Sequence, residues 1–154
     1  MSRRPVRDIP GEPEGSGDLR ETFREHGLRC TRQREVIYEA LAATKAHPTA
    51  EELHEMVRRI EPGLSLATVY NTLEAFSETG LCRKLAGKGG NGASRYDADV
   101  TPHVHIALKD GRVVDVPADL SSAMLGAVPP RTLAELEERL GVKITGVNVD
   151  LSGE

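Results

Sequence analysis

The segment SLATVYNTLEAFSETG, residues 65–80, constrains the fold more than any other part of the chain. Serine is a favoured helix N-cap and glycine a favoured helix stop, so the segment predicts one short helix. Its apolar residues recur at i, i+4 and i+7 and form one face: Val69, Leu73 and Phe76. Small polar groups and a tyrosine lie off that face: Thr68, Tyr70 and Asn71. Such a helix suits the major groove of DNA, although the periodicity alone also fits an ordinary surface helix.

Three further helices are predicted upstream of this segment. Residues 49–60 open on a capping box formed by Thr49 and Glu52. Four apolar residues of that helix are expected to be buried: Leu53, Met56, Val57 and Ile60. Residues 31–44 form another helical pattern, and residues 18–26 form a leading helix that Gly27 ends. The connection EPGL, residues 61–64, has the proline and glycine of a turn between crossed helices.

After Gly80 the pattern changes to short strands. Residues 81–85 and 94–96 flank the glycine-rich run GKGGNG, residues 87–92. The last three of these helices, followed by a two-stranded hairpin, predict a winged helix-turn-helix, with the glycine run as the tip of the wing.

Several segments together resemble the ferric uptake regulator (Fur) family. They are GLRCTRQREVI, HPTAEELHEMV, PGLSLATVYNTLEAFSETGL, RYD, HVHI and GRVVDV, and they lie between residues 27 and 116. The resemblance implies an α+β protein with a winged-helix DNA-binding domain at residues 17–97 and a dimerisation and metal-sensing domain at residues 98–154. It also implies a homodimer that binds a palindromic operator in double-stranded DNA. The matching DNA-binding positions are Arg29, Thr31, Arg34, Ser65, Ala67, Thr68, Tyr70 and Asn71.

Composition agrees with a small intracellular regulator. No apolar run approaches the roughly 20 residues that cross a bilayer, and the charged N-terminus lacks the apolar stretch of a signal peptide, so we expect a cytoplasmic protein without a membrane partner. The Pro- and Gly-rich residues 1–16 predict a disordered tail. The net charge of −4 falls entirely in residues 89–154, and residues 1–88 are neutral overall, so the charge does not exclude DNA binding. Aromatic residues make up only 3% of the chain, so aliphatic packing is expected to dominate the core.

The two cysteines, Cys30 and Cys82, are far apart in sequence, and no CxxC pair is present. This usage indicates a reducing environment and small, buried apolar cysteines. Many Fur-family members bind a structural zinc through two CxxC pairs. This chain departs from that pattern, so no structural four-cysteine zinc is expected, and apolar packing must replace it.

His103 and His105 are separated by one residue on a strand pattern, which points both imidazoles to the same face. The turn that follows has two possible forms. A three-residue loop at residues 109–111, with Gly111 in the left-handed conformation, would place His105 opposite Asp115. A two-residue Asp-Gly loop would instead place Ile106 opposite Asp115 and turn that carboxylate to the other face.

The resemblance to the Fur family implies a regulatory metal site between the two domains. The matching positions are His47, Asp97, His103, His105 and Asp115. Three imidazoles and two carboxylates without thiolate suit Fe²⁺, Mn²⁺ or Zn²⁺, and we expect one divalent ion per protomer. Residues flanking the HxH that would form a second site are Pro102 and Val104, which cannot ligate. The other two histidines, His26 and His54, match no ligand position and are expected at the surface.

The sequence leaves open which of three signals the protein senses: peroxide, heme-linked iron or a metal ion. Aspartate rather than glutamate at position 115 resembles the peroxide-sensing branch, in which a ligand histidine is oxidised; His47 and His103 would be the candidates. The missing zinc resembles the heme-linked iron response regulators, but the triple histidine run of that branch is absent. The function we expect is a metal-dependent DNA-binding repressor of metal homeostasis or of a peroxide response. The alternatives are a heme-linked iron response regulator, a winged-helix DNA-binding protein without metal control and, more remotely, a non-heme metal enzyme. The sequence offers no further general acid or base for an enzyme.

The C-terminal residues predict one more helix and one more strand. Thr132 and Glu135 form a capping box for the helix LAELEERL, which Gly141 would end. Residues 142–151 alternate apolar and polar residues and predict a strand. Residues 117–130 show no clear pattern. A small sheet with one helix buries little area, so this region is expected to dimerise.

Overall fold

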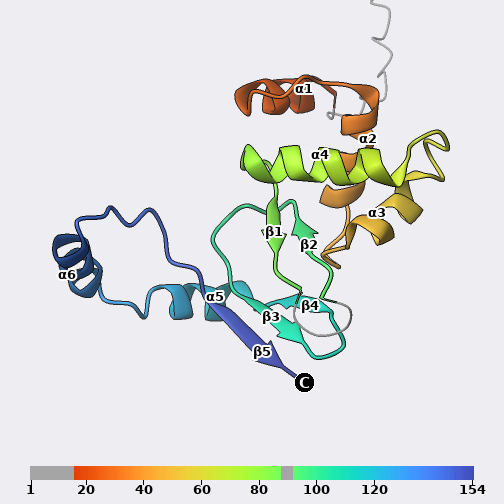
Figure 1. Cartoon of the computed structure of the whole chain (residues 1–154). Coiled ribbons are helices and arrows are strands. Elements are labelled where there is room, and N and C mark those ends of the chain that lie inside the picture. Colours follow the sequence, from red (N-terminus) through yellow and green to blue (C-terminus); the bar gives the residue numbers. More distant parts are fainter. Residues whose placement is uncertain (1–15, 88–91) are drawn as a thin grey trace, which may run out of the picture.

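The computed structural model describes residues 16–87 and 92–154 (Figure 1). Most of the tail predicted at residues 1–16 and most of the predicted wing tip at residues 87–92 therefore lie outside the described residues. The elements, in chain order, are α1 (Ser16–Glu25), α2 (Arg32–Ala42), α3 (Ala50–Val57), α4 (Leu66–Glu78), β1 (Arg83–Leu85), β2 (Arg95–Asp97), β3 (His105–Leu108), β4 (Val113–Asp115), α5 (Ala118–Leu125), α6 (Pro130–Leu140) and β5 (Asp150–Gly153). The protein is α+β, with an N-terminal winged helix-turn-helix followed by a small C-terminal α/β half.

Side-chain caps set the starts of three of the N-terminal helices. Thr31 accepts a hydrogen bond from the Arg34 amide at the start of α2, and Ser65 accepts one from the Thr68 amide at the start of α4. The capping box predicted for α3 is confirmed, because Thr49 and Glu52 each accept a hydrogen bond from the other's backbone amide. Helix α4 thus confirms the helix predicted for residues 65–80.

The helices enclose one continuous core that runs from Leu19 to Tyr96. The predicted inner face of α4 is confirmed, since Val69, Leu73 and Phe76 are all fully buried. Aliphatic residues form most of the core, but its centre is aromatic. The rings of Phe23, Tyr38 and Phe76 meet with centroids 5.7–5.9 Å apart. The few aromatic residues therefore contribute more to the core than their number suggests.

The predicted burial along α3 was wrong at two positions. Met56 is 38% exposed and Ile60 is 60% exposed. The helix ends at Val57, so Ile60 lies in the turn that follows and is not held on the inner face. Only residues one turn apart along the short helix reach the core: Ala50, Leu53 and Val57.

Two small sheets follow the helices. Strands β1 and β2 form the antiparallel hairpin of the wing, with Arg83 opposite Asp97. The second sheet has the order β4-β3-β5, with β3 antiparallel to β4 and parallel to β5. Figure 1 shows helices α1–α4 gathered at one end, the wing hairpin next to α4, and the second sheet beyond the hairpin. The wing thus connects the helical half to the C-terminal half.

The C-terminal elements differ from the sequence predictions in two places. Helix α6 begins at Pro130, so Thr132 lies inside its first turn and is not the cap; proline is favoured at the first helical position and sets the start instead. The predicted strand at residues 142–151 was also wrong, because β5 covers only Asp150–Gly153 and the preceding residues form no regular element. These residues connect α6 back to the sheet. The helix stop at Gly141 is confirmed, with φ +65°.

The unpredicted residues 117–130 include α5, which is linked through Ser121 to Val104, the residue just before β3. The Ser121 hydroxyl accepts a 2.7 Å hydrogen bond from the buried amide of Val104. Helix α6, in contrast, buries no residue against the rest of the protomer, and it stands apart in Figure 1. None of the helices in the described residues is long and apolar enough to cross a membrane.

Candidate metal centre

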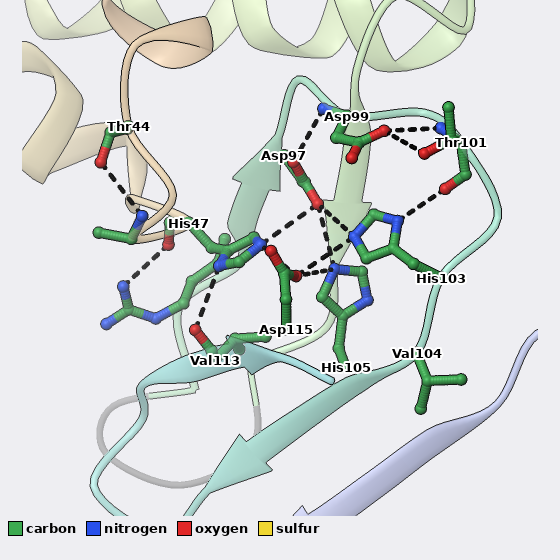
Figure 2. Close-up of polar contacts among 12 residues, drawn as sticks. Thr44, His47, Asp97, Asp99, Thr101, His103, Val104, His105, Val113 and Asp115 are labelled. Carbon is green, nitrogen blue, oxygen red and sulfur yellow. Dashed lines mark hydrogen bonds and ion pairs between the residues drawn. The ribbon is translucent and has the colours of Figure 1, made fainter. Parts of the chain in front are cut away.

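Five side chains from four separate parts of the chain meet between the helical half and the second sheet. His47 precedes α3, and Asp97 ends β2. His105 begins β3, His103 lies two residues before it, and Asp115 ends β4. Figure 2 shows the side chains pointing toward one another. One ligand atom of each lies within 4.8 Å of every other.

The β3–β4 register brings the last of these carboxylates into place. Of the two loop forms considered from the sequence, the three-residue loop is the one observed. The Leu108 amide donates to the Arg112 carbonyl, and Gly111 adopts φ +90°. His105 therefore pairs with Asp115 across the two strands. A one-residue slip would have turned the carboxylate away from the imidazoles.

The spacing of the ligand atoms is regular. Asp97 Oδ2 lies 3.2, 3.0 and 3.1 Å from the Nε2 atoms of His47, His103 and His105, respectively. Asp115 Oδ1 lies 3.0, 3.2 and 3.2 Å from the same three nitrogens. Two ligands that are each about 2.1 Å from a metal and at right angles around it lie about 3.0 Å apart. Each carboxylate oxygen thus has the spacing of a neighbouring ligand to all three imidazoles.

Backbone carbonyls fix the orientation of two of the rings. His47 Nδ1 lies 3.1 Å from the Val113 carbonyl, and His103 Nδ1 lies 2.6 Å from the Thr101 carbonyl. A carbonyl can only accept, so each Nδ1 carries the proton and, in the neutral ring, each Nε2 presents a lone pair to the centre. Lone pairs on the nitrogens and on the carboxylate oxygens then face one another, which a divalent cation would stabilise. The donor set, nitrogen and oxygen without sulfur, fits Fe²⁺, Mn²⁺ or Zn²⁺.

Two buried groups of the cluster, Asp97 and His47, are electrostatically coupled. Burial raises the pKa of the Asp97 carboxyl, but hydrogen bonds from His105 and His47 and from the Asp99 amide outweigh burial and hold the pKa well below its usual range. Burial lowers the pKa of His47, but the hydrogen bond to Asp97 and the charge of Asp115 outweigh it and raise the pKa above its ordinary value. The site therefore favours an ionised Asp97 with a positive charge nearby, whether protons or a metal ion supply it.

A sequence model of the ferric uptake regulator family matches residues 25–126 of this chain. The chain belongs to this family. The peroxide operon regulator of Bacillus subtilis strain 168 is 40% identical to it over 96 residues, which are 62% of this chain and 65% of that protein. The match thus spans slightly less than two thirds of that Fur-family relative.

Solved structures of Fur proteins share the fold. The ferric uptake regulator of Pseudomonas aeruginosa, solved with manganese, superposes with a TM-score of 0.63 at 26% identity and covers 87% of this chain and 95% of that one. The Vibrio cholerae ferric uptake regulator superposes with a TM-score of 0.65 over 89% of this chain and 99% of that one. At 24% identity, the second comparison supports the fold alone.

The remaining histidines of this Fur-family chain lie apart from the cluster. His26 Nδ1 lies 2.8 Å from the Thr22 carbonyl, and His54 Nε2 lies 2.9 Å from the Leu64 carbonyl. Both rings are only half-buried, and each ring hydrogen-bonds to a backbone carbonyl in its own region of the chain. Cys82 is buried, and burial followed by the charges of Asp97 and Glu74 raises its pKa to about 12. Its thiol is therefore unsuited to ligation or redox chemistry.

The residues expected to contact DNA lie on the helical half of the Fur-family fold, at the starts of α2 and α4. All are exposed or half-exposed: Arg29, Thr31, Arg34, Ser65, Ala67, Thr68, Tyr70 and Asn71. Two of them make contacts within the protein. The Arg34 guanidinium donates to the Arg29 carbonyl at 2.9 Å, and the Tyr70 hydroxyl donates to Glu51 at 2.6 Å. Sequence reasoning missed Glu51, because only the packing of α3 beside α4 brings it to Tyr70.

Proposed function

We propose that this chain is a metal-dependent, DNA-binding transcriptional repressor that controls metal homeostasis or a peroxide response. The observation that carries the proposal is the convergence of five metal-ligand atoms from both halves of the protomer. Membership of the Fur family and the name of the Bacillus subtilis relative, a peroxide operon regulator, support it. We assign no catalytic residue to the protein. We expect it to lie in the cytoplasm and to bind double-stranded DNA.

The division of the ligands suggests how a metal would control DNA binding. His47 and Asp97 would hold the cation from the DNA-binding part, which we assign to residues 17–97, and His103, His105 and Asp115 would hold it from residues 98–154. The bound ion would supply a charged crosslink that fixes the angle between the two parts. Metal and DNA would then each tighten the binding of the other, because both favour the same arrangement.

A homodimer is the second part of this proposal. Helix α6 presents apolar side chains to solvent, with Leu136 41% exposed and Leu140 66% exposed, and Val142 just after it is 54% exposed. A second copy of the chain would cover this surface. Two recognition helices in a dimer must reach half-sites about 34–36 Å apart, so the angle fixed at the metal site would decide whether both reach a palindromic operator.

The proposal also concerns the signal that the metal site detects, which is either peroxide or the metal itself. Asp115 is 39% exposed, so the centre is open to small molecules on the side of that carboxylate. With Fe²⁺ bound, His47 or His103 would be the residue oxidised by peroxide, which would remove a ligand and release DNA. A response to the metal alone, without oxidation, is the competing version.

One experiment tests the function as a whole. Protein purified without oxygen is analysed for metal, and its binding to a selected operator is measured as isolated, after chelation, after Mn²⁺ or Fe²⁺ addition, and after peroxide. We expect chelation to weaken operator binding and metal to restore it, and peroxide to weaken binding only with Fe²⁺. Equal operator affinity with and without chelator would contradict metal control. Loss after peroxide with Mn²⁺ as well would contradict oxidation at the iron.

A further inference from the structure

Arg95 makes an unusual set of contacts beside the metal centre. It opens β2 two residues before Asp97, and its side chain is only 13% exposed. Nε donates to the Gly111 carbonyl at 2.5 Å, and Nη1 lies 2.9 Å from the His47 carbonyl. Nη1 also lies 3.0 Å from Glu52 Oε2. One guanidinium therefore joins three chain segments, and none of its contacts is to a ligand side chain.

The contact with His47 concerns the backbone that presents this ligand. His47 has φ +50°, the only positive φ among the non-glycine residues that the structure describes. An L-residue adopts this left-handed conformation reluctantly, so surrounding contacts must hold it. Arg95 holds the carbonyl of His47, and the Val113 carbonyl holds Nδ1 of its ring. Both ends of the residue are thus fixed with Nε2 pointing into the cluster.

The contact with Gly111 crosses between the two halves. Gly111 is the left-handed residue of the β3–β4 turn, whose register places Asp115 opposite His105. The hydrogen bond from Arg95 therefore holds this turn against the helical half without any metal. The link to Glu52 extends the same connection to α3, because Glu52 Oε2 also accepts from the Thr49 amide in the capping box.

We propose that Arg95 is a positioning residue that assembles the metal site before the ion arrives. It fixes the left-handed backbone of His47 and holds the β3–β4 turn, and through Glu52 it connects the site to the helix-turn-helix. Its effect on metal binding rests on the proposed function, but the preassembly itself is a property of the metal-free protein. The flat, forked guanidinium is essential, since the contacts leave from two separate nitrogens, Nε and Nη1, and a lysine ammonium carries all its donors on one nitrogen at the end of a flexible stem.

The first test compares Arg95→Lys with Arg112→Ala. The control removes a cation from the β3–β4 turn that Arg95 contacts, next to Gly111. The Arg112 guanidinium is exposed there, and its side-chain partner among the described residues is Asp110. Affinity is measured with Mn²⁺, and the coordination is read from the visible absorption of the Co²⁺-loaded protein. We expect R95K to bind Mn²⁺ roughly 10–100-fold more weakly, as for other residues that orient metal ligands. We also expect an altered Co²⁺ spectrum for R95K, and R112A to match the wild type in both.

Wild-type affinity and an unchanged Co²⁺ spectrum in R95K would overturn the positioning role. If the wild type itself binds no metal, the proposed function fails, and a second measurement still judges the preassembly. In metal-free wild-type protein, the Arg95 Nε–H should give a resolved NMR signal that exchanges slowly with solvent. A signal that exchanges as fast as that of Arg112 would overturn preassembly, and this measurement does not depend on any variant folding.

Discussion

The Tyr70 hydroxyl donates a 2.6 Å hydrogen bond to Glu51, so the recognition helix α4 and the start of α3 are joined on the surface that would face DNA. The carboxylate holds the phenol in one direction. It also places a negative charge where phosphates would approach, which favours a bound tyrosine that contacts bases rather than the backbone. The first prediction follows from this pair.

Replacing Tyr70 by Ala should weaken operator binding by roughly 1–3 kcal/mol, because a contact to a base edge is lost. Binding to random DNA should largely survive, since phosphate contacts from other residues carry it. Titrations of both DNAs at the same salt concentration would measure the two effects. Tyr70→Phe, which keeps the ring, separates the contribution of the hydroxyl. An equal loss on operator and random DNA would exclude base readout by this residue.

The two carboxylates of the metal centre should not be equivalent. Asp97 is buried and lies within 3.2 Å of all three imidazoles, whereas Asp115 is more exposed. Asp97→Asn should therefore weaken Mn²⁺ binding at least roughly 100-fold, and Asp115→Asn should weaken it less, because water can replace an exposed ligand. Calorimetry or competition with a metal indicator would measure both. Metal-dependent operator binding that persists in Asp97→Asn and in His105→Ala would mean that the regulatory site lies elsewhere.

Stability should depend on pH in opposite ways with and without metal. The raised pKa of His47 contributes stability that is fully present below its ordinary value of 6.5 and is lost as pH rises through the folded-state pKa. The lowered pKa of Asp97 contributes stability that is present above its ordinary value of 3.8 and is lost as pH falls toward the folded-state pKa. The metal-free protein should thus be most stable between about pH 4 and pH 6.5.

Metal should reverse the alkaline side of this profile, because a cation binds the neutral imidazole and competes with its proton. Urea unfolding between pH 5 and pH 8, once with chelator and once with saturating Mn²⁺, would compare the two profiles. We expect the free energy of unfolding to fall above pH 6.5 with chelator and to rise with Mn²⁺. Parallel profiles would show that His47 does not contact the metal.

The exposed face of α6 predicts the effect of a surface change. Leu140→Lys places a charge at a 66% exposed apolar position and should shift the protein from dimer to monomer. Operator binding should fall with it, while each protomer should still bind one metal ion. Sedimentation at several protein concentrations would report the oligomeric state. The matched control is Glu138→Lys on the same exposed helix; if both variants stay dimeric, the dimer forms through another surface.

The turn between β3 and β4 can be tested at Gly111. Its φ of +90° lies in the region that glycine alone adopts readily. Gly111→Ala should destabilise the protein by roughly 1–2 kcal/mol and weaken metal binding, since the turn sets the pairing of His105 with Asp115. Gly63→Ala, at an open position outside the left-handed region, is the control. Chemical unfolding and metal titration of both variants would separate the two effects.

Sequence reasoning worked best where local chemistry decides the structure. The caps at Thr49 and Ser65 define the starts of α3 and α4 from neighbouring residues alone. The sequence left two forms of the β3–β4 loop open, and the structure decides between them. It failed where a short segment depends on its partner. Residues 142–149 have the alternation of a strand, but only Asp150–Gly153 reaches the edge of β3.

The contacts that position the site were the hardest to predict. Arg95 contacts His47 and Gly111, which are both distant from it in the sequence. Glu51 meets Tyr70 only after α3 packs beside α4. Nothing in the local pattern around an arginine or a glutamate distinguishes such a role from a solvated charge. The five clustered side chains were found because they match a known family, and their convergence depends on the tertiary fold.

The cluster also has a consequence for the timing of synthesis. Its first member is His47 and its last is Asp115, and β3 needs β5, near the end of the chain, as its parallel neighbour. A nascent chain therefore cannot offer the complete pocket until Asp115 has left the ribosome. Ions would be captured only once both halves of the protomer have been made and folded together, so an isolated helical half would not withdraw cations from the cell's supply.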